Sequence, residues 1–332
     1  MKVGTGLFPQ SVDHAVAFAE FLETETGYEK LWMTDSHQLY VDTYVALACC
    51  ARATQDLELG TGVTNPVTRH PTVTANAISS VSRIAGGATT LGIGAGDSAV
   101  YSIGRTPATV EELRETAVTI ERLLDGETID FDGEPFQLAQ RNDAVRVDIA
   151  AEGPQTLRMA GEVADGVIFG AGTEPDLVER GLEHVERGTE RAGRSLDDVT
   201  ITLLAPSCVD ESRSAAVEKL LDILEPIAYH NFSFSVDDAP AELRAELREL
   251  VDRHDMREHG QADAEPTAEI SPAVREYLGD RFAVAGTPAE CRRRLERLAG
   301  LGIDELLIGS PVEEQRAELV RFEETVIEPL AV

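Results

Sequence analysis

The sequence predicts an α/β protein in which eight parallel strands, each followed by a helix, close into a barrel. Short β-branched runs alternate with longer segments of helical periodicity along the whole chain. Eight strand-then-helix units occur in this order, which is the number that a closed parallel barrel requires. A chain of 332 residues is also long enough to bury such a core in one domain. A doubly wound open sheet with additional elements is the alternative.

The expected strands are short apolar runs, and helical segments follow them. The strands span residues 2–8, 30–35, 57–63, 89–95, 145–151, 166–170, 199–206 and 304–309. The helices span residues 11–26, 42–54, 71–85, 108–125, 154–163, 175–192, 212–229 and 313–327, and a further helix at 288–300 leads into the last strand.

Two insertions interrupt this alternation, after the fourth and the seventh strands. Residues 126–143 predict a small β-hairpin with its turn at Asp132 and Gly133. Residues 231–282 contain the polar, proline-bearing stretch HGQADAEPTAEISP, which is typical of a loop within a helical excursion. We expect both insertions to belong to one domain over residues 1–332 and to shape the rim of its pocket.

The charge of the chain is strongly negative. Its 60 Asp and Glu residues against 29 Lys and Arg residues give a formal net charge of −31. Such a surface repels nucleic acid and anionic membranes, so neither is an expected partner. The acids are spread through a chain that is 42% hydrophobic, which predicts a folded protein with an acidic shell. A halophile that accumulates salt fits best, because salt screens the self-repulsion, and an unusually acidic mesophilic protein is the alternative.

Several kinds of site and location are disfavoured by the sequence. Cys49, Cys50, Cys208 and Cys291 form neither a CxxC metal pair nor a disulfide framework, so we expect reduced thiols and no metal. HExxH, GxSxG and Walker motifs are absent, which argues against a metalloprotease, an α/β-hydrolase and an NTPase. The start MKVGTGLFPQ is a strand pattern without a signal-peptide profile, and a cytoplasmic location is expected.

Active sites of such barrels lie at the carboxyl ends of the strands. The fourth strand ends in LGIGAGDS, where Gly92, Gly94 and Gly96 alternate and Asp97 follows. The spacing GxGxG and the late start of the next helix do not fit a dinucleotide phosphate loop. Alternate glycines would face one side of the strand and leave a smooth floor that ends at Asp97. In the alternative interpretation, the glycines only relieve crowding and Asp97 caps a turn.

Two other strand ends carry candidate groups. The fifth strand stops at Ala151, Gly153 loosens the turn, and Pro154 stands near the first helical position, so free N–H groups of the helix could bind an anion; a purely structural turn is the alternative. His37 follows the second strand and is a candidate proton carrier, although a histidine there could also be a simple rim residue.

Four blocks of the sequence together resemble the coenzyme F420-dependent branch of the luciferase-like superfamily, and within it the methylenetetrahydromethanopterin reductases. The blocks are LWMTD, LGTGVTNPVTRHPTVTANAISSVSRIAGGATTLGIGAGDSA, EGPQTLRMAGEVADGVIFGA and VAGTPAECRRRLERLAGLGIDELLIGSP. The resemblance implies a luciferase-like TIM barrel that holds the deazaflavin at the strand ends. It also implies a bulge and a non-prolyl cis peptide in the third strand.

The resemblance assigns candidate roles to individual residues. Asp97 matches the acidic residue placed near the transferred hydride or proton, and His37 is the second catalytic candidate. The candidate cofactor contacts are Asp35, Gly62, Val63, Thr64, Asn65, Gly96, Ala151, Glu152, Gly153, Gly170 and Ala171. The chain departs from its relatives in having Gly6 where the reductases carry a glutamate, and in having Ser36 before His37 where many relatives place histidine directly after the aspartate.

The resemblance therefore implies an F420-dependent oxidoreductase that transfers a hydride to a methylene-tetrahydropterin, built on methanopterin or folate. An FMN-dependent monooxygenase on the same barrel is the first alternative. An F420-dependent alcohol or sugar-phosphate dehydrogenase is the second, although the presence of only three lysines, Lys2, Lys30 and Lys219, disfavours a lysine-lined phosphate pocket. A cofactor-binding protein without catalysis is the third. We also expect a homo-oligomer, a dimer or a tetramer.

Overall fold

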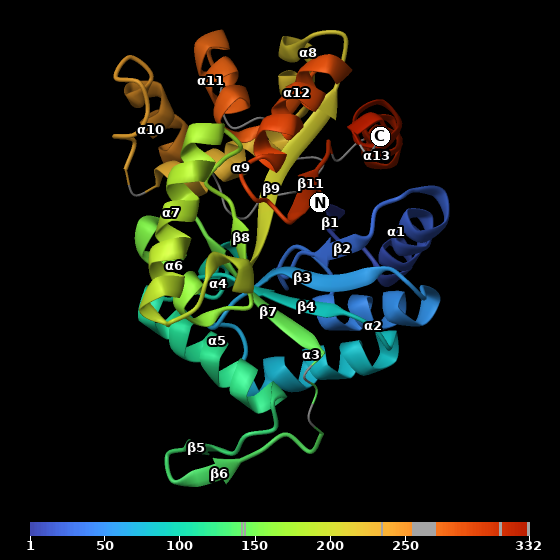
Figure 1. Cartoon of the computed structure of the whole chain (residues 1–332), viewed down its shortest axis with the longest axis vertical. Coiled ribbons are helices and arrows are strands. Elements are labelled where there is room, and N and C mark those ends of the chain that lie inside the picture. The colour runs from blue at the N-terminus through green and yellow to red at the C-terminus, as the bar shows by residue number, and fades with distance from the viewer. Residues whose placement is uncertain (141, 143, 234, 254–269, 312–313, 331–332) are drawn as a thin grey trace.

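Eight parallel strands close into a barrel in the computed structural model, which describes residues 1–140, 142, 144–233, 235–253, 270–311 and 314–330 (Figure 1). Neighbouring strands pair in the order β1-β2-β3-β4-β7-β8-β9-β11, and β11 pairs with β1 again. The strands are β1 (Lys2–Leu7), β2 (Lys30–Met33), β3 (Glu58–Thr64), β4 (Thr89–Ile93), β7 (Val145–Ala151), β8 (Gly166–Phe169), β9 (Thr200–Val209) and β11 (Glu305–Gly309). The closure confirms the predicted barrel and excludes the open sheet.

Helices surround the barrel and begin at local capping signals. Thr109 and Glu112 form a reciprocal capping box at the start of α5, and Pro71 occupies the first turn of α3, which ends at Gly86 with φ of 69°. The surrounding helices are α1 (Val12–Glu25), α2 (Thr43–Ala53), α3 (Pro71–Ala85), α5 (Val110–Leu124), α6 (Pro154–Val163), α7 (Pro175–Arg191), α12 (Pro288–Ala299) and α13 (Gln315–Phe322). Short turns of helix add η1 (Leu196–Asp198), η2 (Glu323–Ile327) and α14 (Glu328–Leu330).

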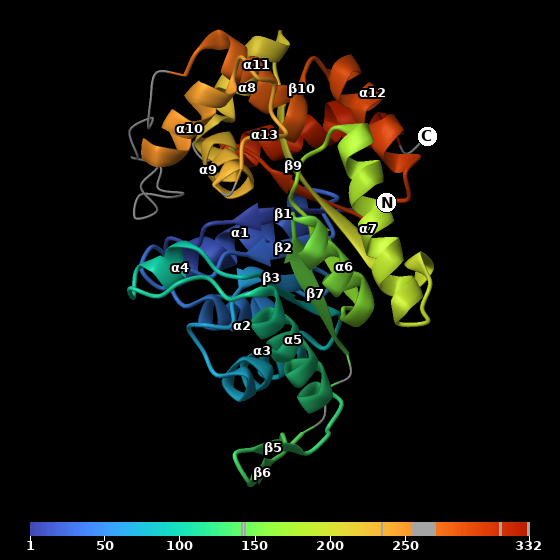
Figure 2. The same cartoon turned by 90° about the vertical axis from the view of Figure 1, so that its left-hand side faces the viewer.

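The first insertion is the predicted hairpin. Strands β5 (Ile129–Phe131) and β6 (Glu134–Phe136) pair antiparallel, and the turn between them has φ of 54° at Asp132 and 91° at Gly133. Two successive residues with positive φ are typical of a type I′ turn, whose twist matches the twist of the paired strands. The hairpin lies at the opposite end of the molecule from α8 and α11 (Figures 1 and 2).

The second insertion is a helical excursion with its own apolar core. It contains α8 (Arg213–Lys219), α9 (Leu221–Phe232), α10 (Arg244–Arg253), α11 (Pro272–Phe282) and β10 (Val284–Gly286). Buried side chains of these elements form a cluster that is separate from the cluster of the barrel. The excursion that we expected at 231–282 therefore begins earlier, at α8, because α8 and α9 pack with α10 and α11. Residues 259–269 of the expected loop lie outside the described residues.

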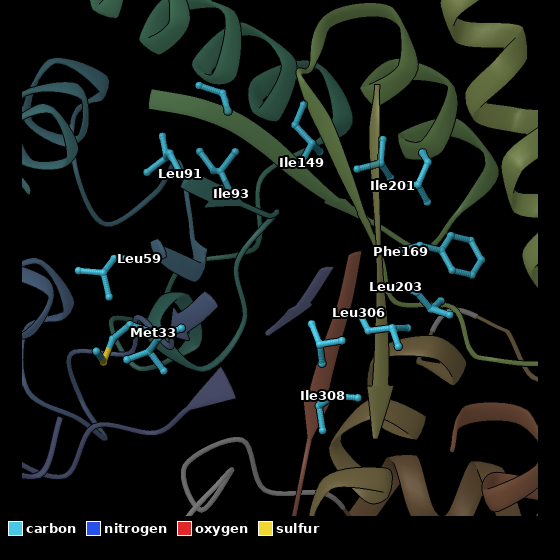
Figure 3. Packing of buried hydrophobic residues seen from close by; sticks show 14 of the residues in the cluster. Met33, Leu59, Leu91, Ile93, Ile149, Phe169, Ile201, Leu203, Leu306 and Ile308 are labelled. Carbon is cyan, nitrogen blue, oxygen red and sulfur yellow. The ribbon is translucent and has the colours of Figure 1, made fainter. Parts of the chain in front are cut away.

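The outward face of the barrel packs against the helices. Strand residues alternate in direction, and side chains such as those of Leu59, Leu91 and Ile149 belong to the barrel's buried cluster (Figure 3). Burial of one such side chain stabilises the fold by about 1.5–3 kcal/mol. The barrel wall is thereby held rigid around its interior.

Charged residues fill the amino-terminal half of the barrel interior. Lys30 Nζ lies 3.2 Å from Glu305 Oε2, and Arg146 pairs with both Glu305 at 2.9 Å and Asp148 at 2.8 Å. Burial alone would raise the pKa of Glu305, but the hydrogen bond from Arg146 and the charges of Lys30 and Arg146 lower it to about 2. This network closes the lower half of the barrel, so any ligand must enter from the carboxyl ends of the strands.

No helix within the described ranges is long and apolar enough to cross a membrane. All four cysteines are free of disulfides, and Cys50, Cys208 and Cys291 are buried.

Candidate active site

An apolar layer lies one step above the charged network and forms a floor. Trp32 is two residues beyond Lys30, and Leu307 is two residues beyond Glu305, so both point into the barrel nearer the carboxyl ends. Trp32, Leu307 and Ile168 form a buried cluster, with Val63, Ala150 and Leu204 packed against it. The Lys30 ammonium lies 3.9 Å from the centre of the Trp32 ring. The floor is therefore flat, apolar and supported from below.

Bare backbone borders this floor on β3 and β4. A Cβ atom at Gly92 would lie 2.2 Å from the Thr61 carbonyl oxygen, and one at Gly94 would lie 3.1 Å from Val63 Cγ2. On the neighbouring strand β3 the Gly62–Val63 peptide is cis, and the pairing register with β4 shifts between Thr61 and Thr64. The bulge and the cis peptide implied by the resemblance are thus present at the expected residues.

Gly96 differs from the expectation of three glycines on one face of a strand. Strand β4 ends at Ile93, and Gly96 has φ of 97°, so it belongs to the turn that follows. A Cβ atom there would lie 2.5 Å from Val100 Cγ2 of α4 (Ser98–Tyr101). Only Gly92 and Gly94 border the floor, and Gly96 turns the chain towards Asp97 and α4.

Asp35, Thr64 and Asn65 are buried and bonded within the protein. Asp35 Oδ2 accepts hydrogen bonds from Thr64 Oγ1 at 2.7 Å and from the Arg69 guanidinium. Asn65 Oδ1 accepts from the N–H groups of Val67 and Thr68, both at 3.0 Å. These side chains fix the loops after β2 and β3, and so they hold the bulge beside the floor.

Asp97 and His230 meet above the floor. His230 Nε2 lies 3.2 Å from Asp97 Oδ2, and Ser98 Oγ donates to Asp97 Oδ1 at 3.0 Å. Ser36 Oγ lies 2.9 Å from Ser98 Oγ, which extends the chain of hydrogen bonds to the end of β2. Asp97 therefore does not cap the first turn of α4 with its side chain, which removes the purely capping interpretation.

The helix that carries His230 is tied to the barrel by its next residue. Asn231 Nδ2 donates to the Gly170 carbonyl oxygen at 3.3 Å, at the end of β8. Burial, the charge of Tyr229 and a hydrogen bond with Tyr229 raise the pKa of Tyr101, so α4 and α9 touch at a second point. Helix α9 of the excursion thus lies against the carboxyl end of β8 and beside α4.

Glu152 completes a cluster of three titratable groups. It follows Arg146, Asp148 and Ala150 at alternate positions of β7, so its side chain continues the inward direction of the strand. A Cβ atom at Gly170 would lie 3.2 Å from Glu152 Oε1, so the carboxylate leans over bare backbone. Glu152 is exposed to solvent.

The charges of this cluster favour the protonated form of His230. Burial disfavours the charged form of His230, but the hydrogen bond and charge of Asp97 and the charge of Glu152 outweigh it and raise the pKa of His230.

The other predicted site residues differ in which of their groups a ligand could contact. Ala151 and Ala171 are buried in the cluster of the barrel, so only their backbone groups are available to a ligand. Gly153 is the residue before α6. It has no side chain that could accept a hydrogen bond from the first N–H groups of that helix. His37 is exposed on the loop after β2. Sequence reasoning missed His230, which no motif around it marks.

Comparison with known proteins gives a consistent picture. The profile of the luciferase-like monooxygenase family matches residues 2–305. A 5,10-methylenetetrahydromethanopterin reductase of Methanolobus tindarius is 27% identical over 97% of this chain and 98% of its own length. The enzyme of the same name from Archaeoglobus fulgidus is 28% identical over 97% of both chains.

A solved structure supports the fold. The coenzyme F420-dependent tetrahydromethanopterin reductase of Methanopyrus kandleri superposes with a TM-score of 0.77 over 99% of both chains, at 22% sequence identity.

Proposed function

Because the chain belongs to the luciferase-like monooxygenase family, we propose that it is a coenzyme F420-dependent oxidoreductase that reduces a methylene-tetrahydropterin. The full-length similarity to 5,10-methylenetetrahydromethanopterin reductases supports this activity. The single structural observation that carries it is the Asp97–His230 pair, held beside bare backbone above an apolar floor. The reaction needs both parts: a flat surface for the cofactor and a proton source beside it.

The residues present fit a flat deazaflavin. The floor around Trp32 and the backbone of Gly92 and Gly94 leave no side chain to obstruct a ring, since side chains at the two glycines would press against Thr61 and Val63. The backbone at Gly170 and Ala171 and the N–H groups at the start of α6 would hold the polar portion of the cofactor. When bound, reduced F420 supplies a hydride donor.

The remaining cofactor contacts act from below and beside the ring. Asp35, Thr64 and Asn65 support the bulge at Gly62 and Val63, and Gly96 sets the direction of the chain towards Asp97. The protein thereby excludes water from one face of the floor and aligns the reactants.

The chain's own residues supply the proton. A methylene bridge opens to an iminium only when a ring nitrogen of the pterin is protonated. Asp97 is the proposed donor, and His230, 3.2 Å away, is the group that resupplies its proton, since this imidazole keeps a proton to a higher pH than a free imidazole would. The negative charge of Glu152 adds to this effect. His37 is the second candidate donor.

Titration of the purified protein with F420, FMN and NADPH tests the cofactor. We expect tight binding of F420 and weak binding of NADPH, because no GxGxxG loop holds a pyrophosphate. Turnover of methylene-tetrahydromethanopterin and methylene-tetrahydrofolate with reduced F420 then tests the substrate. Preferential binding of FMN with oxygen consumption would assign the chain to the monooxygenases of its family instead.

The setting of the enzyme is also part of the proposal. The net charge of −31 supports a protein of a salt-rich cytoplasm, with a small pterin as its only substrate partner and no nucleic acid or membrane. We further propose that residues 1–332 act as one domain and assemble into a dimer or a tetramer.

A further inference from the structure

An arginine-lined cavity lies between the helical excursion and α12 of the barrel. Its volume is about 240 Å³, and it is bordered by the start of α8, the end of α11, β10 and α12. Figure 1 shows α8, α11 and α12 together at one end of the molecule. Four arginines line the cavity, Arg213, Arg293, Arg294 and Arg297, with Asp280 and Glu290 as the two acids.

Both acids of this cavity already have partners. Asp280 Oδ1 pairs with Arg213 Nη2. Glu290 Oε2 accepts hydrogen bonds from the N–H and the hydroxyl of Thr287, at 2.8 and 2.7 Å, in the capping box of α12. The acids therefore neutralise only part of the charge of the four arginines.

Arg294 is held in place but incompletely bonded. Its Nη2 donates to Thr173 Oγ1 at 3.3 Å and to the Asp280 carbonyl oxygen at 2.5 Å. Its Nε is buried and has no acceptor among the described residues. Burial, followed by the charges of Arg297 and Arg213, lowers the pKa of Arg294 to about 10, and the opposing charges of Glu174 and Asp280 only partly offset this.

Arg293 and Arg297 are exposed, and neither forms an ion pair within the part of the chain that the structure describes. The chain as a whole has 60 acidic residues against 29 basic ones. Four arginines around one cavity are therefore a local reversal of the charge of the molecule, and like charges so close together repel one another.

We propose that this cavity binds the phosphate group of a small molecule or free inorganic phosphate. Guanidinium groups form paired, charge-assisted hydrogen bonds to phosphate oxygens, and the exposed guanidinium groups of Arg293 and Arg297, which form no ion pair with described residues, can supply them. The volume is below the roughly 300 Å³ at which pockets for drug-sized ligands begin, so it suits one phosphate group. The net charge of −31 disfavours a nucleic acid as the source of that phosphate.

Calorimetric titration of the full chain with inorganic phosphate, at a fixed KCl concentration, tests the site. We expect one phosphate per chain, and binding weakened at least about tenfold in the double variant R293Q/R297Q. These two side chains make no ion pairs with described residues, so the variant should fold normally. R52Q/R180Q is the matched control, because Arg52 and Arg180 are exposed arginines outside the cavity and the charge change is the same.

The outcomes separate the site from general charge effects. Absence of phosphate binding by the native chain overturns the proposal, and so does an equal loss in R52Q/R180Q. Succinate that binds as tightly as phosphate also overturns it, because the site would then be one for carboxylates. If glycerol phosphate competes with phosphate for the cavity, the natural ligand is a phosphorylated metabolite. If glycerol phosphate does not bind, the natural ligand is inorganic phosphate.

Discussion

His230 Nε2 lies 3.2 Å from Asp97 Oδ2, although Asp97 follows a strand of the barrel and His230 belongs to a helix of the excursion. The carboxylate of Asp97 favours the imidazolium form of His230 and outweighs the effect of burial. The pair therefore keeps a proton on the imidazole to a higher pH than a free imidazole would.

Replacement of Asp97 by asparagine tests the proton donor. Asp97→Asn preserves size but removes the acid, so kcat should fall about 10²- to 10⁴-fold while F420 affinity changes little. Asp252→Asn, at an exposed position of α10, is the control and should leave kcat unchanged. A lower melting temperature with normal turnover per folded molecule would show that Asp97 is only structural.

Replacement of His230 by glutamine tests the pair through its pH dependence. Because the pKa of His230 is raised above its usual 6.5, the protonated pair persists beyond that pH and is lost as the pH rises through the folded-state pKa. The activity of the native protein should therefore decrease at alkaline pH as His230 loses its proton. His230→Gln should lower kcat and abolish this alkaline decrease. His37→Gln is the comparison: if it, and not His230→Gln, changes the profile, the donor role moves to His37.

Salt should stabilise the protein. The Debye length shrinks from about 10 Å at 0.1 M to about 3 Å at 1 M salt, so repulsion within a chain of net charge −31 is progressively screened. We expect the melting temperature to rise by roughly 5–10 °C between 0.1 and 2 M KCl, which corresponds to a few kcal/mol. Sucrose provides the non-ionic control. A melting temperature that does not change with KCl would contradict the halophilic setting.

Replacement of Glu305 by glutamine tests the charged half of the barrel. Loss of one partner of a buried ion pair costs about 3–5 kcal/mol, because Lys30 and Arg146 would be left short of negative charge. Glu127→Gln breaks the exposed pair with Arg122 and should cost about 0–1 kcal/mol. Denaturant titration in molar KCl measures both.

The stability of the same variant at acid pH tests the charged network independently. The pKa of Glu305 is lowered from 4.5 to about 2, so its contribution is present above pH 4.5 and is lost as the pH falls towards 2. Glu305→Gln should flatten the loss of stability in this window. An unchanged slope would mean that the network does not stabilise the barrel.

Local signals in the sequence explain why most of the barrel could be predicted. The helix expected at 154–163 has its predicted ends, because Pro154 occupies the first helical turn. The helix expected at 212–229 instead divides at Leu220, whose N–H bonds to Val217 three residues back at 3.0 Å. Strand β9 continues to Val209 because β10 pairs with its end, and three residues of β10 are too few to show a period.

The site was less predictable than the fold because part of it depends on tertiary contacts. Asp97 could be proposed from its place after a strand, and its catalytic role stays a prediction. His230 lies in the sequence AYHNF, where nothing distinguishes it from an ordinary helical histidine. Only the packing of α9 against the end of β8, through Asn231 and Gly170, brings it to Asp97.

The separate apolar clusters of the barrel and the excursion have a consequence for protein engineering. The strands and outer helices of the barrel depend on one core, whereas the helix that carries His230 depends on the other. Exchange of residues 213–286 between related barrels would leave the first core intact and replace the second as a unit. Chimeras of this kind would keep the redox cofactor while acquiring a different choice of substrate.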